Sequence, residues 1–344
     1  MWLHPNGGSE SGPYVVSFDL NGATGDAPSN QTVNAGELVE KPADPSREGF
    51  DFIGWTTNKT TNQLFDFTTP INQNLTLYAI WQYKPQEGDY TGYYQGINST
   101  DTGEVLVNKL KDIISVVNAS GSNKNTNYEE TIALLQVADL VPGSTTHVYG
   151  IYDSKSILKE WDHINNWNRE HVWPQSLLGE DAKSTTRNMA SDAHNLRACT
   201  PGVNSSRGNK YFDISTTTSS YYPGDDHRGD VARILLYMAV RYKGVLSLVQ
   251  NDPDTYQMAN LTRLKDWHLA DLVDDFEINR NERIYEVQKN RNPFIDHPEL
   301  FEPVWSYFMQ QAGLQRQAIE TMKNTIASYE LNATRYVELE RQYI

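Results

Sequence analysis

The sequence predicts an α+β protein in which a small β-rich module precedes a larger, mainly helical domain. Three observations support this prediction. Short apolar runs separated by turn residues fill residues 14–83, whereas apolar residues recur at helical spacing in the chain that follows. The length of 344 residues exceeds that of one small domain and suits two.

The composition limits the class of protein. Apolar residues make up 38% of the chain, and no uninterrupted apolar run approaches the ~20 residues that a spanning helix needs. Residues 1–13 are rich in Gly, Ser and Pro and are expected to form a flexible leader; they lack the basic start and apolar stretch of a signal peptide. Cys199 is the only cysteine, so the chain has neither an intramolecular disulfide framework nor a thiolate zinc cluster.

The formal net charge of −15 argues against capture of a polyanion by the surface as a whole. Affinity for phosphate would then depend on a local basic patch and a bound metal ion. For an enzyme acting on nucleic acid, we therefore expect a steep loss of activity with salt, because only a small patch would hold the substrate.

The β-rich module contains three strand candidates. Residues 14–20 alternate at strand period and end in Asn21-Gly22, a dipeptide typical of tight turns. Residues 50–55 and 75–81 are the other two candidates. Their aromatic side chains are expected to form the core of the module: Phe50, Phe52, Trp55 and Trp81.

This order of features resembles the Listeria–Bacteroides repeat, the internalin-type B repeat with a β-grasp-like fold. The matching residues are Val16-Ser17-Phe18-Asp19, Asn21-Gly22, Pro42, Arg47-Glu48-Gly49-Phe50, Phe52-Ile53-Gly54-Trp55, Leu75, Tyr78, Ala79 and Trp81. Such repeats occur on bacterial surface and secreted proteins. The resemblance therefore implies a secreted or cell-surface protein, in which the repeat serves as a spacer or binds a cell-wall or surface partner.

A linker over residues 84–92 and a second domain over residues 93–305 are expected to follow. One face of a helix is predicted by the spacing of Leu106, Leu110, Ile113, Ile114 and Val117. Residues 231–249 are predicted to form a buried helix, and residues 292–298 are turn-rich. Residues 306–344 form an amphipathic helical extension with a heptad pattern too short for a coiled coil, which either packs on the domain or associates with a second copy.

The segment before Trp173-Pro174 combines three reactive side chains. Arg169, Glu170 and His171 place a cation, a carboxylate and an imidazole in consecutive positions, typical of binding or catalysis, although a solvated turn is the alternative. In a regular strand Glu170 and His171 would point to opposite faces. Both can serve one site only if the backbone leaves strand geometry there or if an ion lies at the strand edge.

Two downstream segments supply partners for this cluster. Residues 192–196 have strand-like spacing, with polar groups able to bond across to the first strand. Pro201 is a plausible helix start, so that Asn204 would lie in the first turn with Arg207 on the same face. An amide and a carboxylate are hard oxygen ligands that suit Mg²⁺. His171 beside such an ion could deprotonate a water molecule, with Arg207 or Arg187 contacting phosphate.

These motifs, in this order, resemble the bacterial endonuclease I family of secreted or periplasmic nucleases with a ββα-metal motif. They are Glu170-His171-Val172-Trp173-Pro174, Asp192-Ala193-His194-Asn195-Leu196 and Val203-Asn204-Ser205-Ser206-Arg207-Gly208-Asn209. The resemblance covers residues 90–305. It implies that His171 is the general base and that Glu170 and Asn204 bind one Mg²⁺, with Mn²⁺ or Ca²⁺ as alternatives. Arg187 falls where the family often has a phosphate-contacting arginine, although the loop there is shorter than in its disulfide-bonded members.

The supporting residues are expected to act indirectly. Asp192, His194 and Asn195 are interpreted as scaffold around the site, and Asn209 either braces the helix or touches substrate. Three further histidines have no motif around them and are interpreted as structural or surface residues: His163, His227 and His268.

The sequence thus predicts a non-specific endonuclease that hydrolyses DNA and RNA with one metal ion and a histidine base, giving 5′-phosphate products. One alternative is a surface-binding protein whose second domain is an inactive nuclease relic. Another is a metal phosphoesterase for small substrates. Intact Glu170, His171 and Asn204 favour the nuclease, because an inactive relic has no reason to keep all three.

Overall fold

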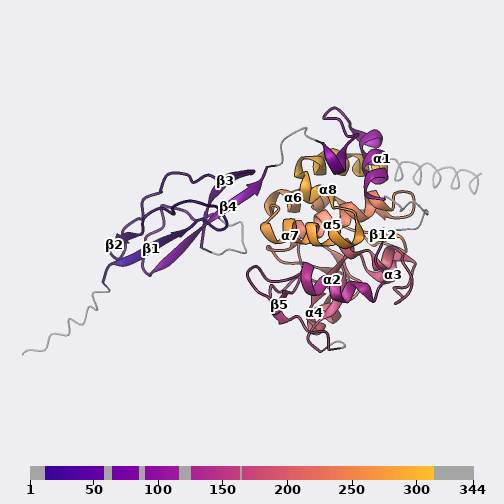
Figure 1. The fold of residues 1–344 in the computed structure, drawn as a ribbon, viewed down its shortest axis with the longest axis horizontal. Helices are drawn as coiled ribbons and strands as arrows, with labels where there is room; N and C mark the ends of the chain where they lie inside the picture. Colours follow the sequence, from indigo (N-terminus) through magenta and orange to yellow (C-terminus); the bar gives the residue numbers. More distant parts are fainter. Residues whose placement is uncertain (1–11, 58–63, 85–89, 116–124, 163–164, 314–344) are drawn as a thin grey trace, which may run out of the picture.

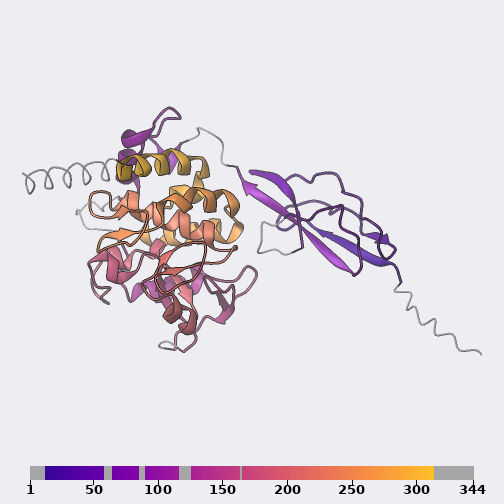
Figure 2. The same cartoon turned by 180° about the vertical axis from the view of Figure 1, so that it is seen from behind.

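The computed structural model describes residues 12–57, 64–84, 90–115, 125–162 and 165–313. An N-terminal sheet and a larger helical body form separate masses in Figure 1 and, seen from behind, in Figure 2. Most of the predicted leader, His163 and most of the predicted C-terminal extension, including its whole heptad pattern, lie outside the described residues. Within the described part, no helix combines the length and the apolar character needed to cross a membrane.

The predicted strands of the N-terminal module form one four-stranded sheet in the order β2-β1-β4-β3. Its strands are β1 (Tyr14–Asp19), β2 (Gln31–Val33), β3 (Phe50–Thr56) and β4 (Leu75–Tyr83). β1 pairs in parallel with β4, and the other two pairs are antiparallel. The three predicted strands are confirmed; β2 is too short to show an alternating pattern. A β-grasp-like fold for this module stays a prediction.

Aromatic side chains fill the core of this sheet, as expected. Trp55 and Trp81 are buried, at 1% and 6% exposure. The half-buried Phe52 ring meets both indoles edge-on, with centroids 5.5 and 5.4 Å away. Asn21 and Gly22 both have positive φ (47° and 94°), the backbone that an Asn-Gly turn adopts readily.

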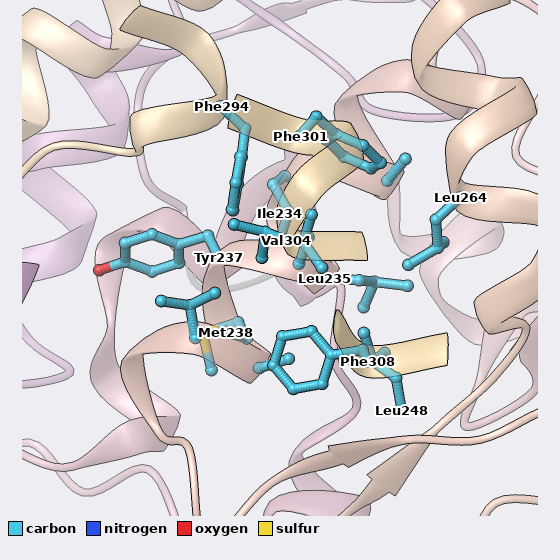
Figure 3. Packing of buried hydrophobic residues seen from close by; sticks show 14 of the residues in the cluster. Ile234, Leu235, Tyr237, Met238, Leu248, Leu264, Phe294, Phe301, Val304 and Phe308 are labelled. Carbon is cyan, nitrogen blue, oxygen red and sulfur yellow. The ribbon is translucent and has the colours of Figure 1, made fainter. Parts of the chain in front are cut away.

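The helical body begins at residue 90 and is built around α5 (Arg228–Arg241), whose residues from Gly229 to Arg241 are all buried. Figure 3 shows Ile234, Leu235 and Met238 of this helix packed among aromatic and aliphatic side chains from the C-terminal part of the chain. The other α-helices are α1 (Gly103–Ile114), α2 (Glu130–Ala138), α3 (Gln175–Leu178), α4 (Pro201–Arg207), α6 (Leu261–Ala270), α7 (Asp275–Gln288) and α8 (Pro293–Asp296).

Short helices and strands complete the body. The 3-10 helices are η1 (Gly92–Tyr94), η2 (Met189–Ser191), η3 (Ala193–Asn195) and η4 (Pro298–Leu300). The strands form four pairs: β5 (His147–Tyr149) with β6 (Ser156–Leu158), β7 (Asn168–His171) with β8 (Leu196–Cys199), β9 (Tyr211–Phe212) with β10 (Ser220–Tyr221), and β11 (Ser247–Leu248) with β12 (Gln257–Met258). The chain is helical again over residues 301–313.

Two predicted segments differ from the structure. The helix predicted over 231–249 ends at Arg241, and β11 follows Gly244, whose φ is 95°. A continuous apolar run does not distinguish a helix from a buried strand, so the predicted helix extended too far, to residue 249. The turn-rich residues 292–298 contain α8 and the start of η4, each with a proline in its first turn.

The strand predicted over 192–196 is wrong for most of its length. The Asp192 side chain accepts the backbone N–H of His194 at 3.1 Å and caps η3, so the strand β8 begins only at Leu196. An aspartate followed by a turn of helix satisfies the free N–H groups at the helix start, and this local preference overrides the apolar spacing.

Candidate active site

Two antiparallel strands and the helix that follows them carry the predicted site. β7 pairs with β8 in continuous register from Asn168 opposite Cys199 to His171 opposite Leu196. α4 starts directly after β8, with Pro201 at its first position as predicted, and packs against β7. The helix lies at the edge of the body that is lowest in Figure 1. The end of β7 and the start of α4 are thus brought together.

Glu170 is buried at 3% exposure, and both of its polar contacts reach the same oxygen. The Tyr152 hydroxyl donates to Oε1 over 2.9 Å, and Nη1 of Arg207 lies 3.1 Å from Oε1. Burial raises the pKa of Glu170, and the Arg207 charge and the Tyr152 hydrogen bond oppose that rise. Only one of the two carboxylate oxygens of Glu170, Oε1, is therefore held by these contacts.

His171 has one ring nitrogen bound and one available. Nε2 donates to the carbonyl oxygen of Ala190 over 2.8 Å, and the ring stacks on Tyr128 at a centroid distance of 5.6 Å. Among the described residues Nδ1 has no hydrogen-bond partner, and the side chain is 8% exposed. Burial lowers the pKa of His171 to about 4. A neutral imidazole whose Nε2 carries the proton has its lone pair on Nδ1.

Glu170 and His171 contact different neighbours because β7 is regular. Glu170 meets Tyr152 and Arg207, whereas His171 meets Tyr128 and the carbonyl of Ala190. A break in strand geometry at these two residues is therefore wrong, since the register is continuous to His171. The alternative, an ion at the end of the strand, stays a prediction.

Arg207 is fully buried, at 0% exposure. Its guanidinium donates to the carbonyl oxygens of His171 and Val172 over 2.9 and 2.5 Å, besides the Glu170 ion pair. It also lies over the Phe212 ring. These contacts tie α4 to the end of β7, and they leave the guanidinium facing protein groups rather than an approaching phosphate.

Asn204 lies in α4, as predicted, where its N–H closes a helical turn on Thr200. It is half-buried, and among the described residues its side-chain amide has no hydrogen-bond partner. A free amide oxygen and the second oxygen of Glu170 are hard donors that fit Mg²⁺, which keeps several of its waters. The described residues contain no cluster of three His, Cys, Asp or Glu able to hold a metal, so a cation here would depend on this two-residue oxygen set.

Arg187 is on the surface and already paired. Its side chain is 44% exposed; Nη2 contacts Oε1 of Glu130 over 2.7 Å, and Nη1 donates to the Asn125 carbonyl over 2.6 Å. The structure does not join it to Glu170, His171 or Arg207. Its predicted contact with phosphate stays a prediction.

The three residues interpreted as scaffold are all buried and hydrogen-bonded. Oδ2 of Asp192 lies 2.6 Å from Nη1 of Arg241. Burial opposes ionisation of Asp192, but the charge of Arg241 keeps the pKa of this carboxyl low. Asn195 pins the chain after β7, because its amide both accepts from the N–H of Trp173 and donates to the Trp173 carbonyl. Burial lowers the pKa of His194 to about 3, and its Nε2 lies 3.3 Å from the Asn290 carbonyl oxygen.

Asn209 lies away from these contacts. It is exposed just beyond α4 and lines a cavity of about 390 Å³ with Lys210 and Tyr211. The other two histidines without a motif are buried: His227 Nε2 bonds the Ser154 hydroxyl over 3.0 Å, and His268 stacks on Phe301 at 4.1 Å.

Two residues that touch the predicted site carry no sequence signal. Tyr152 and Tyr128 belong to segments before β7 and meet Glu170 and His171 only after the chain folds. Neither lies in a motif, and tyrosine is common in this chain. The unusual backbone of Tyr152, with φ at 77°, is visible only in the structure.

Comparison with known proteins identifies both parts of the chain. Residues 162–224 and 217–299 match the Endonuclease I family, and residues 14–80 match the Listeria-Bacteroides repeat domain. The first of these ranges contains every predicted site residue.

Among individual relatives, the extracellular ribonuclease of Bacillus subtilis (strain 168) is 37% identical over 238 residues, which cover 63% of this chain and 79% of the relative. The extracellular ribonuclease of Bacillus amyloliquefaciens is 36% identical over the same shares. An extracellular deoxyribonuclease of Aeromonas hydrophila is 28% identical over 158 residues, 40% of this chain and 65% of the relative. This chain therefore belongs to the endonuclease I family of nucleases and carries a Listeria–Bacteroides repeat ahead of its nuclease region.

Proposed function

We propose that the protein is a secreted, metal-dependent endonuclease that hydrolyses phosphodiester bonds of DNA and RNA without sequence preference. The observation that carries the proposal is the state of the His171 ring: its Nε2 is fixed by the carbonyl of Ala190, so that Nδ1 is the basic nitrogen. The neighbouring residue, Glu170, supplies a buried carboxylate. The names of the relatives, extracellular ribonucleases and an extracellular deoxyribonuclease, support export and both substrates.

His171 acts as the general base in the proposed reaction. Its Nδ1 takes a proton from a water molecule, whose oxygen attacks the phosphorus in line with the bond to the 3′ oxygen. That bond breaks, the 3′ oxygen leaves as a hydroxyl after taking a proton from solvent, and the other product keeps a 5′-phosphate. Because water is the nucleophile, the 2′-hydroxyl of RNA is not needed, and DNA is an equivalent substrate.

Glu170 and Asn204 would hold a divalent cation, Mg²⁺ by preference, with Mn²⁺ or Ca²⁺ as alternatives. When bound, the cation supplies positive charge that binds a phosphate oxygen and stabilises the leaving 3′ oxygen. Arg207 holds Glu170 and the carbonyl groups at the end of β7, and Asn195 fixes the chain just beyond. Arg187 contacts substrate phosphate once it leaves Glu130. Contacts to phosphate and sugar carry no sequence information directly, so no sequence preference is expected.

The N-terminal repeat has a separate role in this proposal. Its sheet contributes no side chain to the contacts of Glu170, His171 or Asn204 described above. We propose that it spaces the nuclease from, or attaches it to, a cell-wall or surface partner.

The test is cleavage of supercoiled plasmid and of single-stranded RNA, with Mg²⁺ or with excess chelator. We expect nicking and RNA breakdown in Mg²⁺ alone, with 5′-phosphate ends. His171→Ala should lower the rate by at least ~10²-fold, the usual contribution of a general base. His147→Ala, in β5, is the matched control and should keep full activity. Absence of Mg²⁺-dependent nicking would overturn the proposal, and full activity of His171→Ala would move the base elsewhere.

Asn204→Ala tests the proposed cation site independently of the proposed base. It should raise the Mg²⁺ concentration needed for half-maximal cleavage while leaving the rate at saturating Mg²⁺ less affected. An unchanged Mg²⁺ requirement would remove Asn204 from the proposed ligands.

A further inference from the structure

Both polar contacts of Glu170, a hydrogen bond and an ion pair, reach the same carboxylate oxygen. The Tyr152 hydroxyl lies 2.9 Å from Oε1, and Nη1 of Arg207 lies 3.1 Å from it. Among the described residues Oε2 has no hydrogen-bond partner, and it is not one of the fully buried atoms that lack one. The carboxylate therefore has one occupied and one open oxygen.

Backbone and ring contacts fix the position of Tyr152. Tyr152 has φ at 77°, in the left-handed region that a bulky side chain rarely adopts. The backbone before it is tied to β8 by the Ile151 N–H, which donates to Ala198 O over 2.9 Å. Its ring lies 5.8 Å from that of Phe212 and 5.3 Å from that of Tyr221. Backbone strain of this kind is kept where the surroundings enforce it, often beside a functional group.

We propose that Tyr152 is a positioning residue for cation binding: by occupying Oε1 of Glu170 together with Arg207, its hydroxyl presents Oε2 to a divalent cation. The inference rests on the proposed function, in which Glu170 binds the cation. A carboxylate free to rotate would lose conformational entropy on binding, whereas one already held by a hydrogen bond and an ion pair has lost it on folding. Tyr152 would thus raise cation affinity without touching cation or substrate.

The experiment measures Mn²⁺ binding directly, by electron paramagnetic resonance of free Mn²⁺, on the full chain without substrate. Tyr152→Phe removes the hydroxyl and keeps the ring contacts. Tyr221→Phe is the matched control, since its ring belongs to the same cluster and, among the described residues, its hydroxyl makes no hydrogen bond to Glu170. Loss of one hydrogen bond to a charged group should weaken binding about tenfold in Tyr152→Phe, and Tyr221→Phe should bind as wild type.

A double-mutant cycle with Glu170→Gln tests whether Tyr152 acts through Glu170. If it does, Tyr152→Phe should add no loss of Mn²⁺ affinity in the Glu170→Gln background. In cleavage assays Tyr152→Phe should need about tenfold more Mg²⁺ with an unchanged KM for RNA. Tyr152→Asn, which tolerates positive φ and lacks the hydroxyl, should show the same loss and serves if the phenylalanine variant does not fold.

The outcomes separate this inference from the proposed function. Wild-type Mn²⁺ affinity in Tyr152→Phe, equal loss in Tyr221→Phe, or an additive loss in the double mutant overturns the positioning role. Wild-type Mn²⁺ affinity in Glu170→Gln overturns the proposed cation site itself. Loss of binding in Glu170→Gln with none in Tyr152→Phe leaves the proposed function standing without this inference.

Discussion

At the scale of single residues, the protonation of His171 would set the pH range of the proposed reaction. Burial removes water from the ring, so that the charged form is disfavoured and the pKa falls to about 4. A general base is active in its neutral form, which prevails above the pKa. The depressed pKa therefore keeps His171 competent well below the pH at which an ordinary histidine becomes charged.

We expect the cleavage rate at saturating Mg²⁺ to hold between pH 8 and about pH 6 and to fall as pH approaches 4. At saturating Mg²⁺ the proposed cation site would keep Glu170 ionised, so the acid limb would report His171. The measurement is the single-turnover rate on RNA against pH, with circular dichroism at each pH to confirm folding. A limb centred near the ordinary histidine value of about 6.5 would contradict this.

Arg207 offers a second residue-level prediction, because its contacts differ from those of a phosphate-binding arginine. Arg207→Gln removes the guanidinium that pairs with buried Glu170 and that donates to the carbonyl groups of His171 and Val172. Breaking a buried pair in this way should lower the free energy of unfolding by about 3–5 kcal/mol. Urea denaturation measures this change. Unchanged stability with a raised KM for RNA would instead favour the phosphate contact predicted from the sequence.

At the scale of elements, η3 depends on one carboxylate that joins three parts of the body. Asp192 caps η3, pairs with Arg241 at the end of α5, and accepts from Gln288 at the end of α7 over 2.8 Å. Tyr237 and Tyr242 also donate to it. This explains in physical terms why Asp192 belongs to the scaffold.

Asp192→Ala should therefore destabilise the nuclease region strongly. The change leaves the Arg241 guanidinium buried without its carboxylate, so we expect a loss of about 3–5 kcal/mol in unfolding free energy. Asp181→Ala, at an exposed carboxylate, should change the same quantity by less than about 0.5 kcal/mol. Equal effects of the two substitutions would remove Asp192 from the role described.

The elements that the sequence predicted correctly have strong local signals. The three long strands of the repeat alternate clearly, and Pro201 marks the start of α4. The expected polar bonding across to the first strand is met only nearby, since Asn195 of η3 bonds Trp173, which lies beyond the end of β7. Element ends were harder, since the apolar run that forms α5 continues past Gly244 into a strand.

The rest of the site could not be predicted because its contacts join distant segments. Burial of Arg207 arises only when α4 packs against β7, and a sequence pattern does not say whether an arginine faces solvent or carbonyl groups. Tyr152 and Tyr128 reach the site from elements with no motif of their own. Of the two alternatives left open for Glu170 and His171, the break in strand geometry is wrong because β7 is regular to His171, and the ion at the strand edge stays a prediction.

At the scale of the whole molecule, the repeat and the nuclease region have separate hydrophobic cores. One core contains Trp55 and Trp81, and the other is built around α5. Arg47 of the repeat contacts Asp275 at the start of α7 over 2.7 Å. A surface ion pair of this kind contributes only about 0–1 kcal/mol.

A chain starting at Tyr90 should therefore retain nuclease activity. We expect its rate of plasmid cleavage to match that of the full chain and its urea midpoint for the nuclease region to shift little. Arg47→Ala in the full chain is the matched control for the ion pair alone. Loss of activity or folding in the shortened chain would mean that the repeat supports the nuclease region directly.

The reactivity of the buried Cys199 thiol depends on local opening of the structure around it. Cys199 is fully enclosed at the end of β8, and burial raises the pKa of its thiol well above the usual range. A thiol reagent can reach this buried sulfur only after its surroundings open, and those surroundings include the strand pair that carries Glu170 and His171. The rate at which this single sulfur reacts would therefore report how often the β7–β8 strand pair opens.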